Sequence, residues 1–200
     1  MLFATGLLDN FPPLPGLIAC LGMTVYVCPD CDGYEIKNKK TLILGNGNVG
    51  ARMALLLRPW TPHMTFINHG QGEVDDGVMD EMKQKGIGYV QEEIVEVLRK
   101  DPGVMRGVKL QDGRELEGER GFIAFGGNVI RSELASQLGV ERMENRHIVT
   151  DPRSKMTSVP GVWSAGDVNV HSEQAVIAMG EGLQCAIWIH KTLVKMDKDL

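Results

Sequence analysis

Two cysteines separated by two residues, Cys28 and Cys31, are the side chains best suited to chemistry, in the run Cys-Pro-Asp-Cys-Asp-Gly. Cysteines at this spacing can close a small disulfide ring and exchange it with other thiols. If a helix begins here, its N-terminal N–H groups favour the thiolate form of one sulfur, the form that attacks disulfides. A carboxylate, Asp32, directly follows the second sulfur. The run therefore predicts a redox function.

The same spacing also occurs in zinc sites, where Cys20 and a histidine would have to complete the ligand set. Structural zinc sites usually combine two such cysteine pairs or a matching pair of histidines. This chain offers one pair, so we expect no metal site. The remaining cysteine, Cys185, lies in an apolar stretch and is expected to pack in the core. Four cysteines in 200 residues favour one redox pair in the cytoplasm over a framework of structural disulfides.

A glycine-rich turn follows the cysteine pair and predicts a dinucleotide site. Residues 41–44 form an apolar run typical of a strand, residues 49–58 a helix, and residues 64–67 a second strand. Between the first strand and the helix lies the pattern GxGxxG, whose glycines permit a tight turn, close approach to a pyrophosphate and close helix–strand packing. The candidate nucleotide-binding residues are Gly45, Asn46, Gly47, Asn48, Val49 and Gly50.

The end of the second strand should distinguish the two nicotinamide nucleotides. An acidic residue there would bind the ribose 2′-hydroxyl of NAD, whereas arginines would bind the 2′-phosphate of NADP. The sequence instead reads Asn68-His-Gly-Gln-Gly72, with Glu73 and Asp75 a little beyond. The choice between NADH and NADPH therefore stays open, with NADPH slightly disfavoured.

The C-terminal third carries a second candidate site. We predict a strand over 159–167 that stops at Gly166 and Asp167, and a long helix opened by Gln174 and Ala175. An aspartate at a strand end near a helix N-terminus can hold a ribityl or sugar hydroxyl. It can equally be an ordinary N-cap residue. Among the histidines we single out only His171, which closely follows the Gly-Asp pair.

Further strands are predicted between these two regions and after them. Hairpin signals suggest a β-meander over residues 94–116, and a buried strand follows at 121–125. We also expect a short helix over 131–138 and a strand over 146–150. Together the pattern predicts an α/β fold.

Composition excludes several classes of function. The chain has 26 acidic and 21 basic residues and a net charge of −5, so it offers no broad basic surface for nucleic acid. Its apolar runs are short and interrupted, so we expect neither a membrane span nor a signal peptide. An apolar fraction of 43% and a charged fraction of 24% are ordinary for a globular protein.

Taken in order, these motifs resemble the low-molecular-weight thioredoxin reductase family of FAD- and NAD(P)H-dependent disulfide oxidoreductases. The resemblance rests on Ala4-Thr-Gly6 with its proline-rich connector, Cys28-x-x-Cys31-Asp-Gly, the glycine-rich turn, and Pro160-Gly-Val through Gly166-Asp167 to Gln174-Ala175. It implies a three-layer Rossmann-like FAD/NAD(P)-binding fold with an inserted β-meander. Its implied domains are a FAD-domain remnant over 1–10, an NAD(P)-binding domain over 11–125, and the C-terminal part of the FAD domain over 126–200.

The resemblance also implies a chemistry. NAD(P)H would reduce FAD, FAD would reduce the Cys28–Cys31 disulfide, and the dithiol would reduce a thioredoxin-like protein or a small disulfide. Cys28 would attack the partner, Cys31 would face the flavin, and Asp32 would transfer protons. The flavin would contact Gly166, Asp167, Gln174 and Ala175. The enzyme would be a disulfide reductase, with a possible homodimer formed through the FAD domain.

Departures from the family pattern leave two alternatives. The family's first strand–GxGxxG–helix, which cradles the adenosine and pyrophosphate of FAD, does not occur in this sequence. The chain could therefore be a nucleotide-binding module without flavin or turnover. The ending Leu56-Leu-Arg-Pro-Trp60 and the segment Asn68-His-Gly70 resemble a branch that contains dithiol oxidases of the gliotoxin and holomycin type. Those oxidases tend to have histidine where this chain has Asp32, which favours the reductase.

Overall fold

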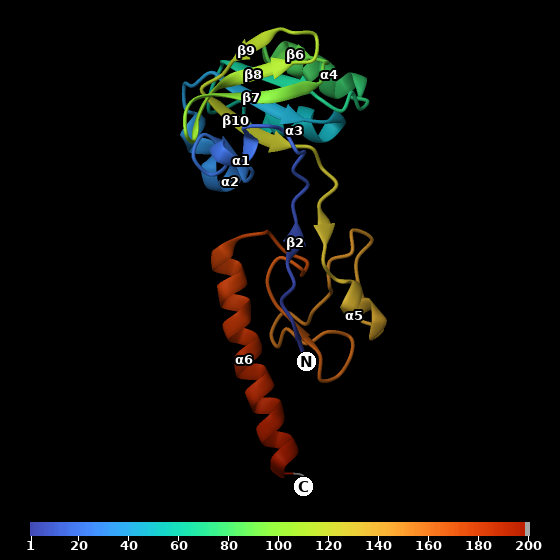
Figure 1. Ribbon diagram of the computed structural model, residues 1–200. Helices are drawn as coiled ribbons and strands as arrows, with labels where there is room; N and C mark the ends of the chain where they lie inside the picture. Colours follow the sequence, from blue (N-terminus) through green and yellow to red (C-terminus); the bar gives the residue numbers. More distant parts are fainter. Residues whose placement is uncertain (199–200) are drawn as a thin grey trace. The chain divides into compact units, whose positions relative to one another are not determined.

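The computed structural model describes residues 1–198, which divide into two compact units (Figure 1). One unit comprises residues 10–127, and the other joins residues 1–9 to residues 128–198. Among the described residues no helix has both the length and the apolar composition needed to cross a bilayer.

A five-stranded sheet, all parallel, forms the middle of unit 10–127, in the order β3-β10-β4-β5-β6. Consecutive strands such as β4 and β5 pair in parallel because a helix returns the chain between them. The strands are β3 (Val25–Tyr26), β4 (Thr41–Gly45), β5 (Met64–Asn68), β6 (Gly88–Val90) and β10 (Arg120–Ala124).

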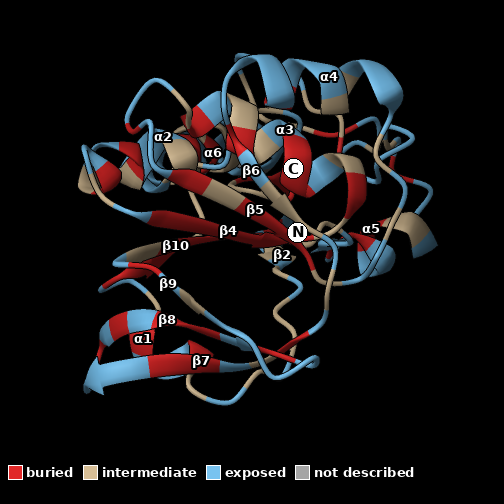
Figure 2. Ribbon diagram, turned by 90° about the horizontal axis from the view of Figure 1, so that it is seen from above, coloured by how far each residue is buried: buried red, intermediate tan, exposed pale blue. Residues whose placement is uncertain are grey.

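Each face of this sheet is covered by a different layer (Figure 2). One face packs on two helices, α3 (Gly47–Leu57) and α4 (Asp76–Gln84). The other face packs on an antiparallel meander of β7 (Ile94–Asp101), β8 (Val104–Leu110) and β9 (Glu115–Glu117). Side chains alternate between the two cores, with Leu42 and Leu44 toward the meander and Ile43 toward the helices. The predicted α/β fold with three layers and an inserted meander is confirmed.

Short elements precede the first long strand of this unit. They are α1 (Leu17–Cys20), the single turn α2 (Pro29–Asp32) and the 3₁₀ turn η1 (Gly33–Ile36). The helix after the glycine-rich turn begins at Gly47, two residues before the predicted start. Gly47 has a φ of 51°, a backbone conformation that a glycine adopts at little cost.

The second unit is built from short strand pairs and one long helix. Its strands are β1 (Leu2–Phe3), β2 (Leu7–Leu8), β11 (Val129–Ile130) and β12 (Trp163–Ser164), and its helices are α5 (Glu133–Gln137) and α6 (Ala175–Lys198). Strand β1 pairs in parallel with β12, and β2 pairs antiparallel with β11. The N-terminal residues thus supply strands to the C-terminal block.

Two predicted strands of this unit are wrong in extent. The strand expected over 146–150 does not form, because Ile148 makes only isolated bridges to Arg142 and Asn169. The strand expected over 159–167 shortens to β12, since its pairing partner β1 is itself only two residues long. Ile148 and Val162 are nevertheless buried in the core of the unit, so the apolar pattern reflected burial rather than a long ladder.

Candidate functional site

The cysteine pair forms a disulfide at the start of α2. The Cα atoms of Cys28 and Cys31 are 5.3 Å apart. Cys28 is the N-cap residue of α2, and its sulfur accepts a hydrogen bond from the N–H of Cys31 at 3.1 Å. That N–H would stabilise negative charge on the Cys28 sulfur after reduction. Cys28 is half-buried and Cys31 is exposed, so the disulfide can be reached from solvent.

Asp32, next to the disulfide, is suited to proton transfer. Partial burial raises the pKa of its carboxyl group, and the charge of Glu35 raises it further. A higher pKa brings the carboxyl group closer to the neutral range in which an acid–base group works well. The next residue, Gly33, packs too closely on Trp60 to carry a side chain, because a Cβ there would lie 2.8 Å from Nε1 of Trp60. The redox turn therefore rests directly on an aromatic ring.

The glycine-rich turn has the tight geometry of a dinucleotide-binding motif. A Cβ on Gly45 would lie 2.9 Å from the Cα of Gly50, and a Cβ on Gly50 would lie 2.2 Å from the Phe66 ring. The first glycine thus lets the strand meet the helix, and the third lets α3 approach β5. Val49 is half-exposed on α3, which also lies beside α2. The structure therefore brings the disulfide and the glycine-rich turn onto neighbouring helices.

The second glycine of the turn does not face open space. A Cβ on Gly47 would lie 2.9 Å from the carbonyl oxygen of Glu73, in the segment after β5. The side chains of Asn46 and Asn48 also bind this segment, at Gly72 and Asp75. The turn has the shape that a pyrophosphate requires, but in this conformation residues 72–75 lie against it.

In the second unit, Gly166 and Asp167 follow β12 as predicted. Gly166 has a φ of 80°, which favours glycine. Oδ1 of Asp167 is buried without a hydrogen-bond partner in the described part of the chain. The backbone carbonyl oxygen of Gln174 accepts the first hydrogen bond of α6, from the N–H of Ala178 at 3.0 Å. An unpaired carboxylate oxygen fits a ligand hydroxyl, so these residues suit the ribityl chain of a flavin.

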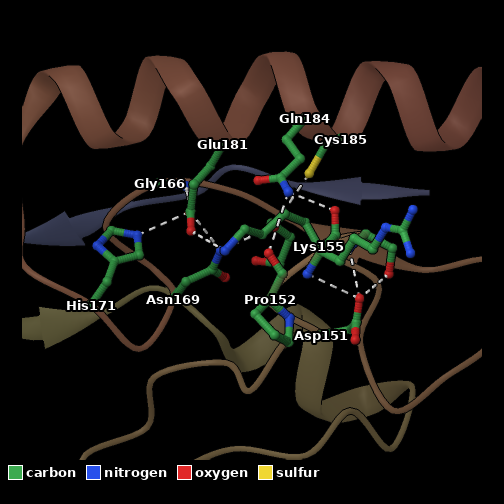
Figure 3. Close-up of polar contacts among 12 residues, drawn as sticks. Asp151, Pro152, Lys155, Gly166, Asn169, His171, Glu181, Gln184 and Cys185 are labelled. Atoms are coloured by element: carbon green, nitrogen blue, oxygen red, sulfur yellow. Dashed lines mark hydrogen bonds and ion pairs between the residues drawn. The ribbon is translucent and has the colours of Figure 1, made fainter.

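A buried carboxylate that we did not predict holds this turn in place (Figure 3). Oε2 of Glu181, on α6, accepts hydrogen bonds from the N–H of Gly166 and from Nδ2 of Asn169, both at 2.9 Å. The same oxygen lies 3.0 Å from Nε2 of His171, and Oε1 pairs with Nζ of Lys155 at 2.8 Å. Glu181 is the one charged residue over 175–189, and that isolated charge was the available signal.

Two opposing effects set the charge state of Glu181. Burial alone would raise the pKa of its carboxyl group. Hydrogen bonds from Lys155, Gly166 and Asn169, with the nearby His171, outweigh burial and hold the pKa below its ordinary value. Glu181 is therefore an anion at neutral pH and anchors the Gly166–Asp167 turn to α6.

Comparison with known proteins identifies relatives for most of the chain. The pyridine nucleotide-disulphide oxidoreductase family matches residues 1–182. The thioredoxin reductase of Coxiella burnetii is 27% identical over 200 residues, which cover 94% of this chain and 62% of that protein. The thioredoxin reductase of Escherichia coli O157:H7 is 27% identical over 203 residues, which cover 94% of this chain and 62% of that protein.

Solved structures give the same result. The crystal structure of HlmI matches 99% of this chain and 61% of its own length, with 31% identity and a TM-score of 0.87. A putative thioredoxin reductase from Bacillus anthracis matches 98% of this chain and 65% of its own length, with 25% identity and a TM-score of 0.83. This chain thus spans about three-fifths of the length of the thioredoxin reductases and solved structures that it matches.

Proposed function

The chain belongs to the pyridine nucleotide-disulphide oxidoreductase family, and on that premise we propose that it passes electrons from NAD(P)H through FAD to the Cys28–Cys31 disulfide. The resulting dithiol would reduce a thioredoxin-like protein or a small disulfide in the cytoplasm, and the protein would work as a homodimer. The observation that carries this proposal is the solvent-accessible disulfide at the N-terminus of α2, with Asp32 beside it.

Three sets of residues would have separate roles: binding the flavin, binding the nicotinamide nucleotide and transferring protons. FAD and NAD(P)H, when bound, supply two-electron transfer to the disulfide. We propose that Gly166, Asp167, Gln174 and Ala175 bind the flavin, since Asp167 offers a buried acceptor and Gln174 opens α6. Residues 45–50 would bind the nicotinamide nucleotide through the glycine-rich turn. Asp32 would supply and remove protons as the disulfide opens and closes.

The exchange step uses the two cysteines in sequence. Two electrons and two protons convert the disulfide to a dithiol. The Cys28 thiolate attacks the partner's disulfide, whose S–S bond breaks as a mixed disulfide forms. Cys31 then attacks the Cys28 sulfur, which restores the Cys28–Cys31 disulfide and releases the partner as a dithiol. Cys28 is the nucleophile in this scheme because its sulfur accepts the N–H of Cys31.

This proposal is tested by turnover with added FAD and with NADH or NADPH. The probes are a chromogenic aromatic disulfide and oxidised thioredoxin. The variant is Cys28→Ser, and Cys20→Ser is the matched control because Cys20 is a buried free cysteine outside the disulfide. We expect Cys28→Ser to abolish turnover and Cys20→Ser to preserve it. Unchanged turnover in Cys28→Ser would show that the cysteine pair does not take part in the reaction.

A second candidate is the oxidation of a small dithiol, with molecular oxygen as the oxidant. Here the substrate's two thiols become a disulfide, the Cys28–Cys31 disulfide is reduced, and oxygen takes up both electrons through the flavin as hydrogen peroxide. The covered surface of Gly47 favours this direction, because such an oxidase needs no nicotinamide donor. Oxygen consumption that depends on an added dithiol and on no nucleotide would select it over the reductase.

A further inference from the structure

We infer that residues 70–75, here called the strap, close the nucleotide-binding turn of unit 10–127, and that NAD(P)H binds only when the strap moves away. This inference rests on the proposed nucleotide site and adds its regulation. The strap follows β5 and runs to the start of α4. Its contacts involve three consecutive residues of the turn: Asn46, Gly47 and Asn48.

The first contact joins the strap to Asn46. The N–H of Gly72 donates a hydrogen bond to Oδ1 of Asn46 at 2.9 Å. The strap lies so close to this amide that a Cβ on Gly70 or on Gly72 would come within 2.6 or 2.7 Å of the same oxygen. Glycine at both positions therefore allows the strap to rest on the Asn46 side chain.

A reciprocal pair of hydrogen bonds joins the far end of the strap to Asn48. Nδ2 of Asn48 donates to Oδ1 of Asp75 at 2.8 Å, and the N–H of Asp75 donates to Oδ1 of Asn48 at 3.0 Å. The Asp75 carboxylate also lies 3.7 Å from the guanidinium of Arg52, one turn further along α3. These contacts tie the strap to the same helix start that would receive a pyrophosphate.

The middle of the strap occupies the surface of Gly47. In a dinucleotide-binding turn the second glycine lets the backbone approach the pyrophosphate. Here the carbonyl oxygen of Glu73 fills that space, 2.9 Å from where a Gly47 Cβ would lie. The N–H of Gly47 is also used, since it donates to Oδ1 of Asn68 at 2.9 Å. An oxygen of the strap, from Glu73, and an oxygen at the end of β5, from Asn68, therefore lie against the glycine that a pyrophosphate would approach.

The closed strap is held mainly by hydrogen bonds, including one from Nδ2 of Asn68 to the carbonyl oxygen of Gly72 at 2.7 Å, and by one apolar side chain, Val74, packed against the helix-side core. Four of its six residues are exposed, and only Gly72 and Val74 are half-buried. Gln71 has a φ of 53°, a left-handed conformation that costs energy in a residue with a side chain. A mostly exposed, strained segment held by a few hydrogen bonds and one half-buried valine can open without unfolding the unit. Closure then lowers the apparent nucleotide affinity by the fraction of molecules that are open.

Substitution of Asp75 tests the strap without changing the turn itself. Asp75→Ala removes the acceptor of the Asn48 bond, while Asp75→Asn keeps an acceptor oxygen and removes only the charge. Asp75 is the N-cap residue of α4 but its side chain makes no cap bond. Both variants lose the same charge at the helix start, so comparison of the two isolates the bond to Asn48. Dissociation constants for NADH and NADPH are measured on the full chain, together with hydrogen exchange of the Gly72 amide by NMR.

We expect Asp75→Ala to tighten nucleotide binding about fivefold, the effect of losing one net hydrogen bond that favours closure. It should also speed exchange at Gly72, while Asp75→Asn should change both quantities much less. If the two variants change nucleotide affinity and Gly72 exchange equally, or change neither, the strap does not regulate binding. The assignment of the nucleotide site itself would then be unaffected. Absence of nucleotide binding in the wild type and in both variants would overturn the nucleotide site, and with it the proposal that the strap regulates that site, whatever the exchange rate at Gly72.

Discussion

Asp32 illustrates how burial and a neighbouring charge together raise the pKa of a candidate proton-transfer group. Sequence alone identified the pair Cys28 and Cys31 and the adjacent carboxylate, because their types and spacing are local. It did not show that Glu35 lies close enough to raise the pKa of Asp32. That effect depends on how the one-turn helix α2 leads into η1, which no pattern in the sequence specifies.

We predict that Glu35→Gln lowers the pKa of Asp32, because it removes the second of the two causes that raise it. Burial remains, so the pKa should stay above its ordinary value. The measurement is a carboxyl-detected NMR titration of Asp32. Asp30→Asn is the matched control, since Asp30 is an exposed acid in the same helix. An Asp32 titration that is the same in wild type and Glu35→Gln would refute the assignment.

A second prediction concerns the pH dependence of stability that Glu181 imposes. Its pKa is lowered in the folded state, so its contribution is fully present above the unfolded value of about 4.3 and is lost as pH falls through the folded pKa. Glu181→Gln should therefore destabilise the second unit by about 3 kcal/mol at pH 7, because it leaves Lys155 without its buried counter-ion. The difference from wild type should shrink below about pH 4.

Denaturant unfolding at pH 7 and at pH 3.5 measures this difference. It is followed by the fluorescence of the three tryptophans, of which Trp163 and Trp188 lie in the second unit. Glu133→Gln is the control, because the side chain of Glu133 is 64% exposed in its ion pairs with Arg142 and Arg146. We expect the control to cost less than about 1 kcal/mol. A Glu181→Gln penalty that stays the same at both pH values would contradict the assignment of an ionised Glu181.

The pair formed by β4 and α3 shows what local patterns predict well. The strand, the turn and the helix follow from an apolar run, three glycines and apolar residues up to Leu57, and all three form. The strap was not predictable in the same way. Its closure requires Asn46 and Asn48 to meet Gly72 and Asp75, about 26 positions away, and asparagine is an ordinary residue in any loop.

The third glycine of the turn provides a matched test of helix packing. We predict that Gly50→Ala destabilises unit 10–127 by about 1–3 kcal/mol, because the new Cβ would lie 2.2 Å from the Phe66 ring. Gly77→Ala, in α4, has open space around the new Cβ and should stabilise by about 0.5–1 kcal/mol. Denaturant unfolding measures both. A Gly50→Ala protein as stable as Gly77→Ala would show that α3 does not pack closely on β5.

The chain as a whole keeps its candidate groups in two units. The disulfide and the glycine-rich turn belong to residues 10–127, whereas the Gly166–Asp167 turn and Glu181 belong to the other unit. Helix α6 also carries exposed apolar side chains at Val176, Met179 and Leu183. The order of motifs along the sequence predicted the family. Sequence could not reveal how Glu181 anchors the Gly166–Asp167 turn, since that depends on α6 crossing residues 155–171.

The most direct measurement of electron transfer to the Cys28–Cys31 disulfide is a count of new thiols by mass spectrometry. The protein is incubated without oxygen, with FAD and NADH or NADPH, and alkylated in its native state. Cys20 and Cys185 are buried, and burial raises the pKa of the Cys185 thiol to about 11, so both should stay unlabelled. We predict label at Cys28 and Cys31 that requires both FAD and nucleotide. A disulfide that remains intact under these conditions would contradict the proposed function.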